Sequence, residues 1–152
     1  MERISPFLWF DTQAEEAMRF YLNIFQESRE VAIHRYGDAG PGPKGSVMTV
    51  VFELNGTQFV ALNGGPKFAF TPAVSFVIKC ADQIEIDHYW NALTADGGKP
   101  IECGWLVDKF GLSWQVVPAN IGELVDKPKV MQAVMKMKKF DIAALEAARD
   151  RE

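Results

Sequence analysis

Gln115 is a polar residue inside an apolar segment, LSWQVVP at 112–118. A buried amide must find hydrogen-bond partners, because unpaired donors and acceptors in an apolar setting cost free energy. Gln115 therefore either faces solvent on a half-buried strand or lines a polar pocket, and its sequence neighbours do not decide between these. In a pocket, its amide would hydrogen-bond a ligand.

Cys103, Trp105 and Asn63 could also contact a ligand. Cys103 and Trp105 share one face of the strand-like segment 99–108, and Asn63 ends another strand on the same side as Phe59. The thiol would need a cationic or dipolar neighbour to be reactive, and none is evident, so inert packing is its ordinary role. Asn63 either offers a polar contact or turns the chain before the two glycines that follow.

The remaining reactive residue types form no catalytic arrangement. His34 and His88 fall in different halves of the chain without an orienting partner, so we expect neither to be a base. Cys80 and Cys103 form no C-x-x-C motif, which argues against a zinc ribbon or a thioredoxin-type centre. We expect both thiols to be reduced.

The first 68 residues predict one β-α-β-β-β module. Thr12 and Glu15 form a T-x-x-E capping box, after which apolar residues recur at helical spacing. Asn55-Gly56 supplies the positive φ angles of a tight hairpin. The expected strands are 4–10, 30–36, 46–54 and 58–63.

The same order of elements then repeats. A strand at 73–80 precedes a second capping box, Asp82 with Glu85, and a helix that Gly97-Gly98 stops. Strands are expected at 99–108 and 112–118, with a turn at Phe110-Gly111, and helices at 129–140 and after Asp141. The pattern predicts an α+β domain with module one at 1–68, module two at 69–118 and a helical extension at 119–152.

Composition limits the classes of partner. The chain has 152 residues, enough for one domain, and its net charge of −4 argues against nucleic acid or an anionic membrane as the main partner. No apolar run is long enough to cross a bilayer, and the start MERISPFLWF lacks signal-peptide features. We therefore expect a cytoplasmic protein.

The tandem modules resemble the vicinal oxygen chelate superfamily of glyoxalase I, extradiol dioxygenases and bleomycin-resistance proteins. The resemblance is closest to the PhnB-like branch, and it covers nearly the whole chain. The segments that carry it are PFLWFDTQAEEAMRFYLNIF at 6–25, FELNGTQFVALNGGPKF at 52–68, SFVIKC at 75–80, CGWLVDKFGLSWQVVP at 103–118 and MQAVMKMKKFDIAALEAA at 131–148. It implies two βαβββ modules whose sheets form a cup, with the active site on the concave face, and a homodimer.

The resemblance also implies where a metal would bind. In metal-dependent members, the first and last strands of each module supply four inward ligands, usually His, Glu or Gln. The matching positions here are Pro6, then one of Val60, Ala61 and Leu62, then Ser75 and Gln115. One Gln and one Ser do not make a metal site, so we expect neither a metal nor a cofactor. Gln115 then resembles a remnant ligand that faces the cup.

The orientation of the first strand depends on Pro6. If Pro6 faces the cup, Leu8 and Phe10 line it and Trp9 packs beneath a helix. The expected ligand-binding residues are Leu8, Phe10, Phe59, Asn63, Ser75, Cys103, Trp105 and Gln115.

PhnB-like proteins are often named 3-demethylubiquinone-9 3-methyltransferase, so the segment GDAGPGP at 37–43 must be compared with the cofactor-binding loop of a methyltransferase. It superficially resembles an S-adenosylmethionine-binding loop, but a strand rather than a helix is expected after it. Pro41 and Pro43 also lack the N–H donors that such a loop uses. We expect a mobile connector that covers the cup instead.

The sequence thus favours a protein that binds a small, partly apolar molecule without a metal. A metal-dependent lyase or dioxygenase of the same superfamily is the alternative, and methyltransfer is a third. Whether the molecule is transformed stays open, as do its identity and the geometry of the dimer. The methionine-rich helix after Lys129 is a candidate dimer contact, although methionines also fill ordinary cores.

Overall fold

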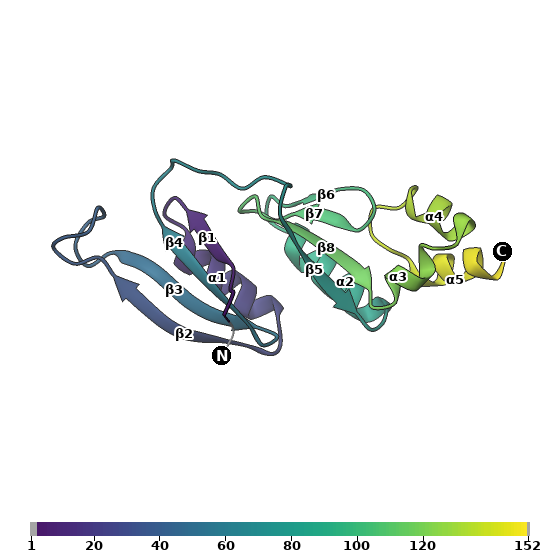
Figure 1. The fold of residues 1–152 in the computed structure, drawn as a ribbon, viewed down its shortest axis with the longest axis horizontal. Coiled ribbons are helices and arrows are strands. Elements are labelled where there is room, and N and C mark those ends of the chain that lie inside the picture. Colours follow the sequence, from purple (N-terminus) through teal and green to yellow (C-terminus); the bar gives the residue numbers. More distant parts are fainter. Residues whose placement is uncertain (1–2, 152) are drawn as a thin grey trace. The chain divides into compact units, whose positions relative to one another are not determined.

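The structure, a computed structural model, describes residues 3–151 and divides between Phe70 and Thr71 into two compact units (Figure 1). Unit 1 ends at Phe70 and unit 2 begins at Thr71. Each unit holds a four-stranded mixed sheet and a helix that covers one face of it. None of the helices in residues 3–151 is long and apolar enough to cross a membrane.

Unit 1 has the predicted β-α-β-β-β order. Its elements are β1 (Phe7–Phe10), α1 (Ala14–Ile24), β2 (Ser28–Arg35), β3 (Val47–Leu54) and β4 (Thr57–Asn63). The sheet order is β1-β4-β3-β2, with β1 parallel to β4 and the other pairs antiparallel. Asn55 and Gly56 both have positive φ, as the predicted hairpin turn requires.

Unit 2 repeats this order and adds C-terminal helices. The elements are β5 (Ser75–Cys80), α2 (Gln83–Thr94), β6 (Lys99–Pro100), β7 (Trp105–Val107), β8 (Ser113–Pro118), α3 (Ile121–Leu124), α4 (Pro128–Val134) and α5 (Ile142–Asp150). The sheet order is β5-β8-β7-β6, with β5 parallel to β8, which is the topology of unit 1. The predicted α+β fold with tandem modules is thereby confirmed.

The core of unit 1 lies between α1 and one face of the sheet. The ring of Tyr21 on α1 stacks on Phe52 of β3 with centroids 6.4 Å apart, and Phe52 stacks on Phe59 of β4 at 5.6 Å. Strand side chains alternate between faces, so the buried Leu8 and Phe10 of β1 belong to this same covered face. Apolar burial under α1 is therefore what fixes the orientation of β1 and β4.

The start of α1 differs from the sequence prediction. The N-cap residue is Gln13 rather than Thr12, and its side chain makes no cap hydrogen bond. The amide of Asn63 takes over this role, because its Oδ1 accepts a hydrogen bond from the N–H of Ala14 at 2.8 Å. A partner 49 positions away in sequence satisfies the helix, which no local capping pattern can reveal.

The second capping box is confirmed. Asp82 Oδ1 accepts a hydrogen bond from the N–H of Glu85 at 2.9 Å, and Glu85 Oε2 accepts one from the N–H of Ala81 at 3.3 Å. The helix that follows, α2, buries Ile86, Tyr89, Trp90 and Leu93. The sheet face that packs against α2 carries the buried Leu106, Trp114 and Val116.

The predicted strand at 99–108 is wrong, since it is broken into β6 and β7. Between them Cys103 and Gly104 have φ of +58° and +81°. A Cβ on Gly104 would lie 2.4 Å from the ring of Phe140, so glycine lets this ring pack against the backbone. The chain turns here to receive the C-terminal segment, whose carbonyls at Met137 and Lys138 accept hydrogen bonds from the N–H groups of Cys103 and Gly104.

The C-terminal helices are held through a second carboxamide. Gln83 Nε2 donates to the carbonyl of Phe140 at 2.9 Å, and Gln83 Oε1 accepts from the N–H of Ile142, the first residue of α5, at 2.8 Å. The predicted cap at Asp141 is confirmed, because its Oδ1 accepts from the N–H of Ala144 at 3.1 Å. The predicted helix at 129–140 is shorter than expected, since α4 ends at Val134.

Candidate functional site

The face of the unit 2 sheet opposite α2 gathers polar side chains around Gln115. Gln115 of β8 pairs with Val77 of β5 on one side and with Trp105 of β7 on the other. Ser75 and Ser113 lie one pleat away on the same face, because they form the neighbouring same-face pair of β5 and β8. We call Ser75, Trp105, Ser113 and Gln115 the polar face of unit 2.

A hydrogen bond joins two members of this polar face. Gln115 Nε2 donates to Ser75 Oγ at 3.0 Å, and both residues are half-buried, as is Trp105. A hydroxyl that accepts one hydrogen bond still has a proton to donate, and the Gln115 Oε1 is an acceptor. The pair therefore presents one donor and one acceptor next to an indole.

Ser113 is a member that the sequence prediction missed. Its side chain is 1% exposed, and its Oγ is a buried polar atom without a hydrogen-bond partner among residues 3–151. Buried polar atoms without a hydrogen-bond partner are uncommon in folded proteins, and a bound water or ligand is one explanation for them. Its two-residue spacing from Gln115 was the available signal, because alternate strand residues share a face.

Three predicted site residues of unit 1 lie on the opposite face from the one expected. Leu8, Phe10 and Phe59 are 5%, 4% and 5% exposed and belong to the core under α1. The assumption that Pro6 sets the inward face was wrong for β1, since burial beneath the helix decides the orientation. Trp9 is likewise not beneath α1: its Nε1 donates to the carbonyl of Gly65 at 2.9 Å, and its ring meets Phe68 edge-on.

Asn63 is engaged in the architecture of unit 1. Besides capping α1, its Nδ2 donates to the carbonyl of Val47 at 3.2 Å, and its own carbonyl accepts from the hydroxyl of Tyr36 at 2.6 Å. The amide thus ties together α1, β3 and β4. The sequence left open whether Asn63 contacts a ligand or has a structural role, and these hydrogen bonds favour the structural role.

The prediction that Cys103 shares a strand face with Trp105 is wrong, because Cys103 lies in the turn before β7. Its Sγ donates to the carbonyl of Val134 at 3.6 Å, next to the C-terminal helices. The other thiol, Cys80, is buried, and this burial raises its pKa to about 12, with Glu85 and Asp82 adding repulsion of the thiolate.

The residues at the metal-ligand positions implied by the resemblance do not fit a metal. In unit 1 these positions hold apolar side chains, and the Pro6 carbonyl is used by the N–H of Val60 at 3.0 Å. In unit 2 they hold Ser75 and Gln115, which bond to each other. Across residues 3–151 no group of three or more His, Cys, Asp or Glu is placed to hold an ion. His34 and His88 lie in separate units.

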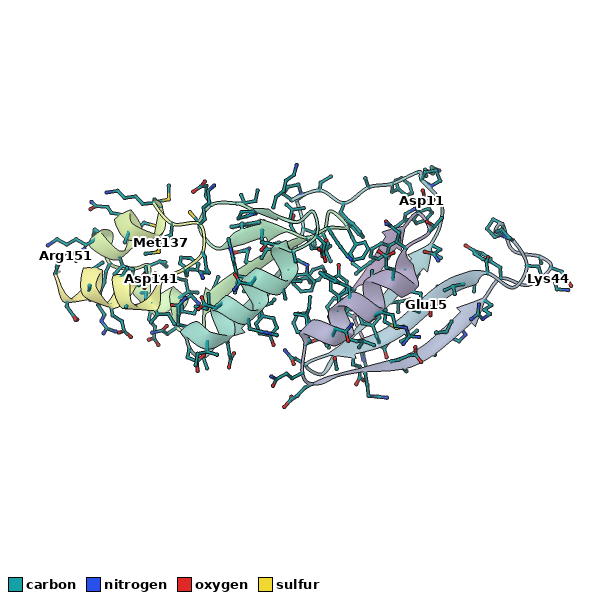
Figure 2. The ribbon with its side chains drawn as sticks, turned by 180° about the vertical axis from the view of Figure 1, so that it is seen from behind. Asp11, Glu15, Lys44, Met137, Asp141 and Arg151 are labelled. Atoms are coloured by element: carbon teal, nitrogen blue, oxygen red, sulfur yellow. The ribbon has the colours of Figure 1, made fainter. Side chains whose placement is uncertain are left out.

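Unit 1 contains a cleft of about 500 Å³ that the sequence did not predict. Its walls are the residues Asp11 and Thr12 before α1 with Glu15 of α1, the loop between β2 and β3, and the turn at Asn63–Gly65. Figure 2 shows Glu15 on α1, Asp11 near the start of that helix, and Lys44 at the outer end of the loop. The segment GDAGPGP at 37–43, predicted to be a mobile connector over the cup, supplies Pro41, Gly42 and Pro43 to this wall.

Solved structures of other proteins share this fold. A PhnB protein from Bacillus cereus, described provisionally as a 3-demethylubiquinone-9 3-methyltransferase, is 37% identical, with a TM-score of 0.69 over 76% of this chain and 99% of that one. The fosfomycin resistance protein FosX from Mesorhizobium loti is 16% identical, with a TM-score of 0.59 over 84% of this chain and 100% of that one, which shows the fold alone. A protein from Pseudomonas aeruginosa is 21% identical, with a TM-score of 0.64 over 78% of this chain and 98% of that one.

These likenesses and the tandem modules define a glyoxalase-like protein of the vicinal oxygen chelate superfamily. Within it, the chain belongs to the PhnB-like family described as 3-demethylubiquinone-9 3-methyltransferase, which matches residues 2–117. Among curated proteins none matches the chain.

Proposed function

We propose that this PhnB-like protein binds a small, partly apolar molecule on the polar face of unit 2, without a catalytic metal. The observation that carries the proposal is the pair of Gln115 and Ser75, bonded at 3.0 Å beside Trp105. An apolar surface with a few fixed polar groups is the usual composition of a small-molecule site. The unpaired Ser113 hydroxyl supports the same location.

The chemistry of the polar face favours a neutral oxygen-bearing ligand. Ser75 can donate an O–H hydrogen bond, and Gln115 Oε1 can accept one. The four residues carry no ionic charge, so nothing there would pair with a formal charge on the ligand. An alcohol or carbonyl compound with an apolar body against Trp105 suits these groups.

The main alternative is a metal-dependent lyase or dioxygenase, as in other members of the superfamily. Its test is metal content, measured by elemental analysis on untagged protein before and after incubation with zinc, nickel, manganese and ferrous iron. Retention of about one ion per chain after desalting would contradict the metal-free proposal. Methyl transfer has less support, because the glycine-rich loop joins antiparallel β2 and β3 and is not followed by a helix.

The binding proposal is tested with a thermal-shift screen of small alcohols and carbonyl compounds, followed by titration of any hit. We expect Gln115→Ala to weaken that hit by about tenfold, the effect of one polar contact of 1.4 kcal/mol. Gln132→Ala is the matched control, since Gln132 is exposed on α4. Equal loss in both variants, or none in either, would remove Gln115 from the site.

A homodimer and a cytoplasmic location complete the proposal. Met131 and Met135 of the C-terminal region are 39% and 64% exposed, while Val130 and Val134 of α4 are buried. The exposed methionines are the proposed dimer contact. Sedimentation equilibrium of the chain and of Met135→Glu tests this, and a wild-type monomer would contradict it.

A further inference from the structure

We propose that the cleft of unit 1 is a second small-molecule site, which takes a ligand with a protonated amine and a compact apolar body. The cleft is lined by residues of unit 1 and the polar face belongs to unit 2, so this inference does not depend on the proposed function. Its volume, about 500 Å³, lies within the range of pockets that hold small organic ligands.

The wall made by the β2–β3 loop is built by close packing. Tyr36 is 7% exposed, and its hydroxyl donates to the carbonyl of Asn63 at 2.6 Å, which joins the loop to the end of β4. A Cβ on Gly42 would lie 2.4 Å from the Tyr36 ring, so the loop backbone packs directly on that ring. The two ends of the loop are also joined, because the N–H of Tyr36 donates a hydrogen bond to the carbonyl of Ser46 at 2.9 Å. The cleft is therefore held open by defined contacts.

The opposite wall is acidic. Asp11 and Glu15 both line the cleft, and no lysine or arginine does. Asp11 makes no ion pair within residues 3–151, whereas Glu15 lies 3.2 Å from Arg19, which it shares with Glu30 at 2.9 Å. Lys44 pairs instead with Asp38 at 3.0 Å and lies at the outer end of the loop (Figure 2).

The start of α1 opposes this negative charge, but only in part. A helix N-terminus is equivalent to about half a positive charge, and the N–H of Ala14 is already used by Asn63. Two carboxylates, one of them partly neutralised by Arg19, exceed that half charge. The sign of the cleft is therefore negative, and an ammonium group is the ligand charge that suits it.

The remaining lining defines the rest of the ligand. Pro41, Pro43 and Val47 are apolar, and the ring of Tyr36 lies among the lining residues. Thr12 and Ser46 add hydroxyl groups that can accept hydrogen bonds from an ammonium. An amine attached to a ring or a short apolar chain would place its charge at Asp11 and its body against the prolines.

Three probes with one phenylethyl body separate charge from shape: 2-phenylethylamine, 2-phenylethanol and 3-phenylpropanoate. Each is titrated into the full chain labelled with ¹⁵N, and amide shifts are followed. We expect the amine to shift the amides of Glu15, Ser46, Gly64 and Gly65, and to bind about fivefold more tightly than the alcohol, as for a partly exposed ion pair. The propanoate should bind most weakly.

Two variants with a matched control test the carboxylates. Asp11→Asn and Glu15→Gln should each weaken the amine by about threefold to fivefold and leave the alcohol unchanged. Glu16→Gln removes the same charge from an exposed position one residue away that does not line the cleft, so it should leave all three probes unchanged. The unbound spectrum of each variant shows whether it folds.

Several results would overturn the inference. Equal affinity for the amine and the alcohol would remove the charge argument, and preference for the propanoate would reverse its sign. Shifts confined to Ser75, Ser113 and Gln115 would place the amine on the polar face of unit 2 instead. Absence of any shift at the solubility limit of the amine would mean that the cleft is not a site for this class.

Discussion

At the scale of single residues, Asp108 is a buried carboxylate that accepts three hydrogen bonds in unit 2. The residue is 2% exposed; its Oδ1 accepts hydrogen bonds from the N–H groups of Phe110 and Leu112 at 2.9 and 3.0 Å, and its Oδ2 accepts from Trp114 Nε1 at 2.9 Å. The carboxylate therefore shapes the turn before β8, the strand that carries Ser113 and Gln115. Removal of one side chain would leave three donors without their acceptor.

We predict that Asp108→Ala lowers the free energy of unfolding by about 3 to 5 kcal/mol, because buried donors lose a charged acceptor. Asp108→Asn should cost about 1 to 3 kcal/mol, since its amide nitrogen would face the N–H of Trp114. Asp126→Ala, at an exposed position, is the control and should stay within about 0.5 kcal/mol. Urea unfolding followed by tryptophan fluorescence measures all three, and an unchanged midpoint for Asp108→Ala would refute the prediction.

Cys80 should make the stability depend on alkaline pH. Burial raises the pKa of its thiol from 9.0 to about 12 in the folded chain. Between these values the unfolded chain loses a proton that the folded chain keeps, so the unfolding free energy falls as pH rises above about 9, by up to roughly 1.4 kcal/mol per pH unit. Below pH 8 the thiol contributes no slope.

The thiol's contribution is isolated by comparing wild type with Cys80→Ala in urea between pH 7.5 and 10.5. The variant should lose stability less steeply above pH 9 than the wild type does. The same burial predicts that a thiol reagent at pH 8 labels Cys103 first and Cys80 only on unfolding. Parallel pH curves for wild type and Cys80→Ala would contradict the assigned cause.

At the scale of elements, the side-chain amides of Asn63 and Gln83 make structural contacts that the sequence analysis did not predict. Asn63 caps α1 in place of Thr12, and Gln83 joins α2 to the start of α5. Gln83 Nε2 and Lys139 Nζ both contact Asp87 Oδ1, at 3.1 and 2.8 Å, and these bonds lower the pKa of that carboxyl, with that of Lys139 the larger cause. The C-terminal helices are thus attached through a small polar network.

We predict that Gln83→Met loosens this attachment and keeps the side-chain volume. Loss of the two bonds to Phe140 and Ile142 should cost about 1 to 3 kcal/mol and raise hydrogen exchange at the start of α5. Gln132→Met on the exposed face of α4 should change neither quantity. If exchange in α5 is the same in Gln83→Met and wild type, the amide does not hold the C-terminal segment.

The elements also show what sequence reasoning can reach. The repeated order of strands and helices, the Asn55-Gly56 turn and the Asp82 cap depend on local patterns, and these were predicted correctly. The break at Cys103 and Gly104 depends on Phe140, more than thirty positions later, and the orientation of β1 depends on what α1 covers. Ser75 and Gln115 were correctly placed on one sheet face, whereas Ser113 was missed although its two-residue spacing from Gln115 was a local signal.

At the scale of the whole molecule, the two units have separate cores, and the segment from Gly64 to Val74 joins them without a helix or strand. Within this segment Phe68 is 55% and Val74 is 63% exposed. Exposed chain that lacks ladder or helix hydrogen bonds is where proteases cut folded proteins first. A protease specific for aromatic residues should therefore act here before it acts in either core.

We predict that brief chymotrypsin treatment at low enzyme ratio cleaves after Phe68 or Phe70, giving fragments close to 1–70 and 71–152. Phe52 and Phe59 should survive, because both are buried in the stacked core of unit 1. Intact-mass spectrometry identifies the first cut, and Phe68→Ala with Phe70→Ala should delay it. First cleavage inside β3 or β4 would mean that unit 1 opens more readily than the connecting segment, and its core would then not be an independent folding unit.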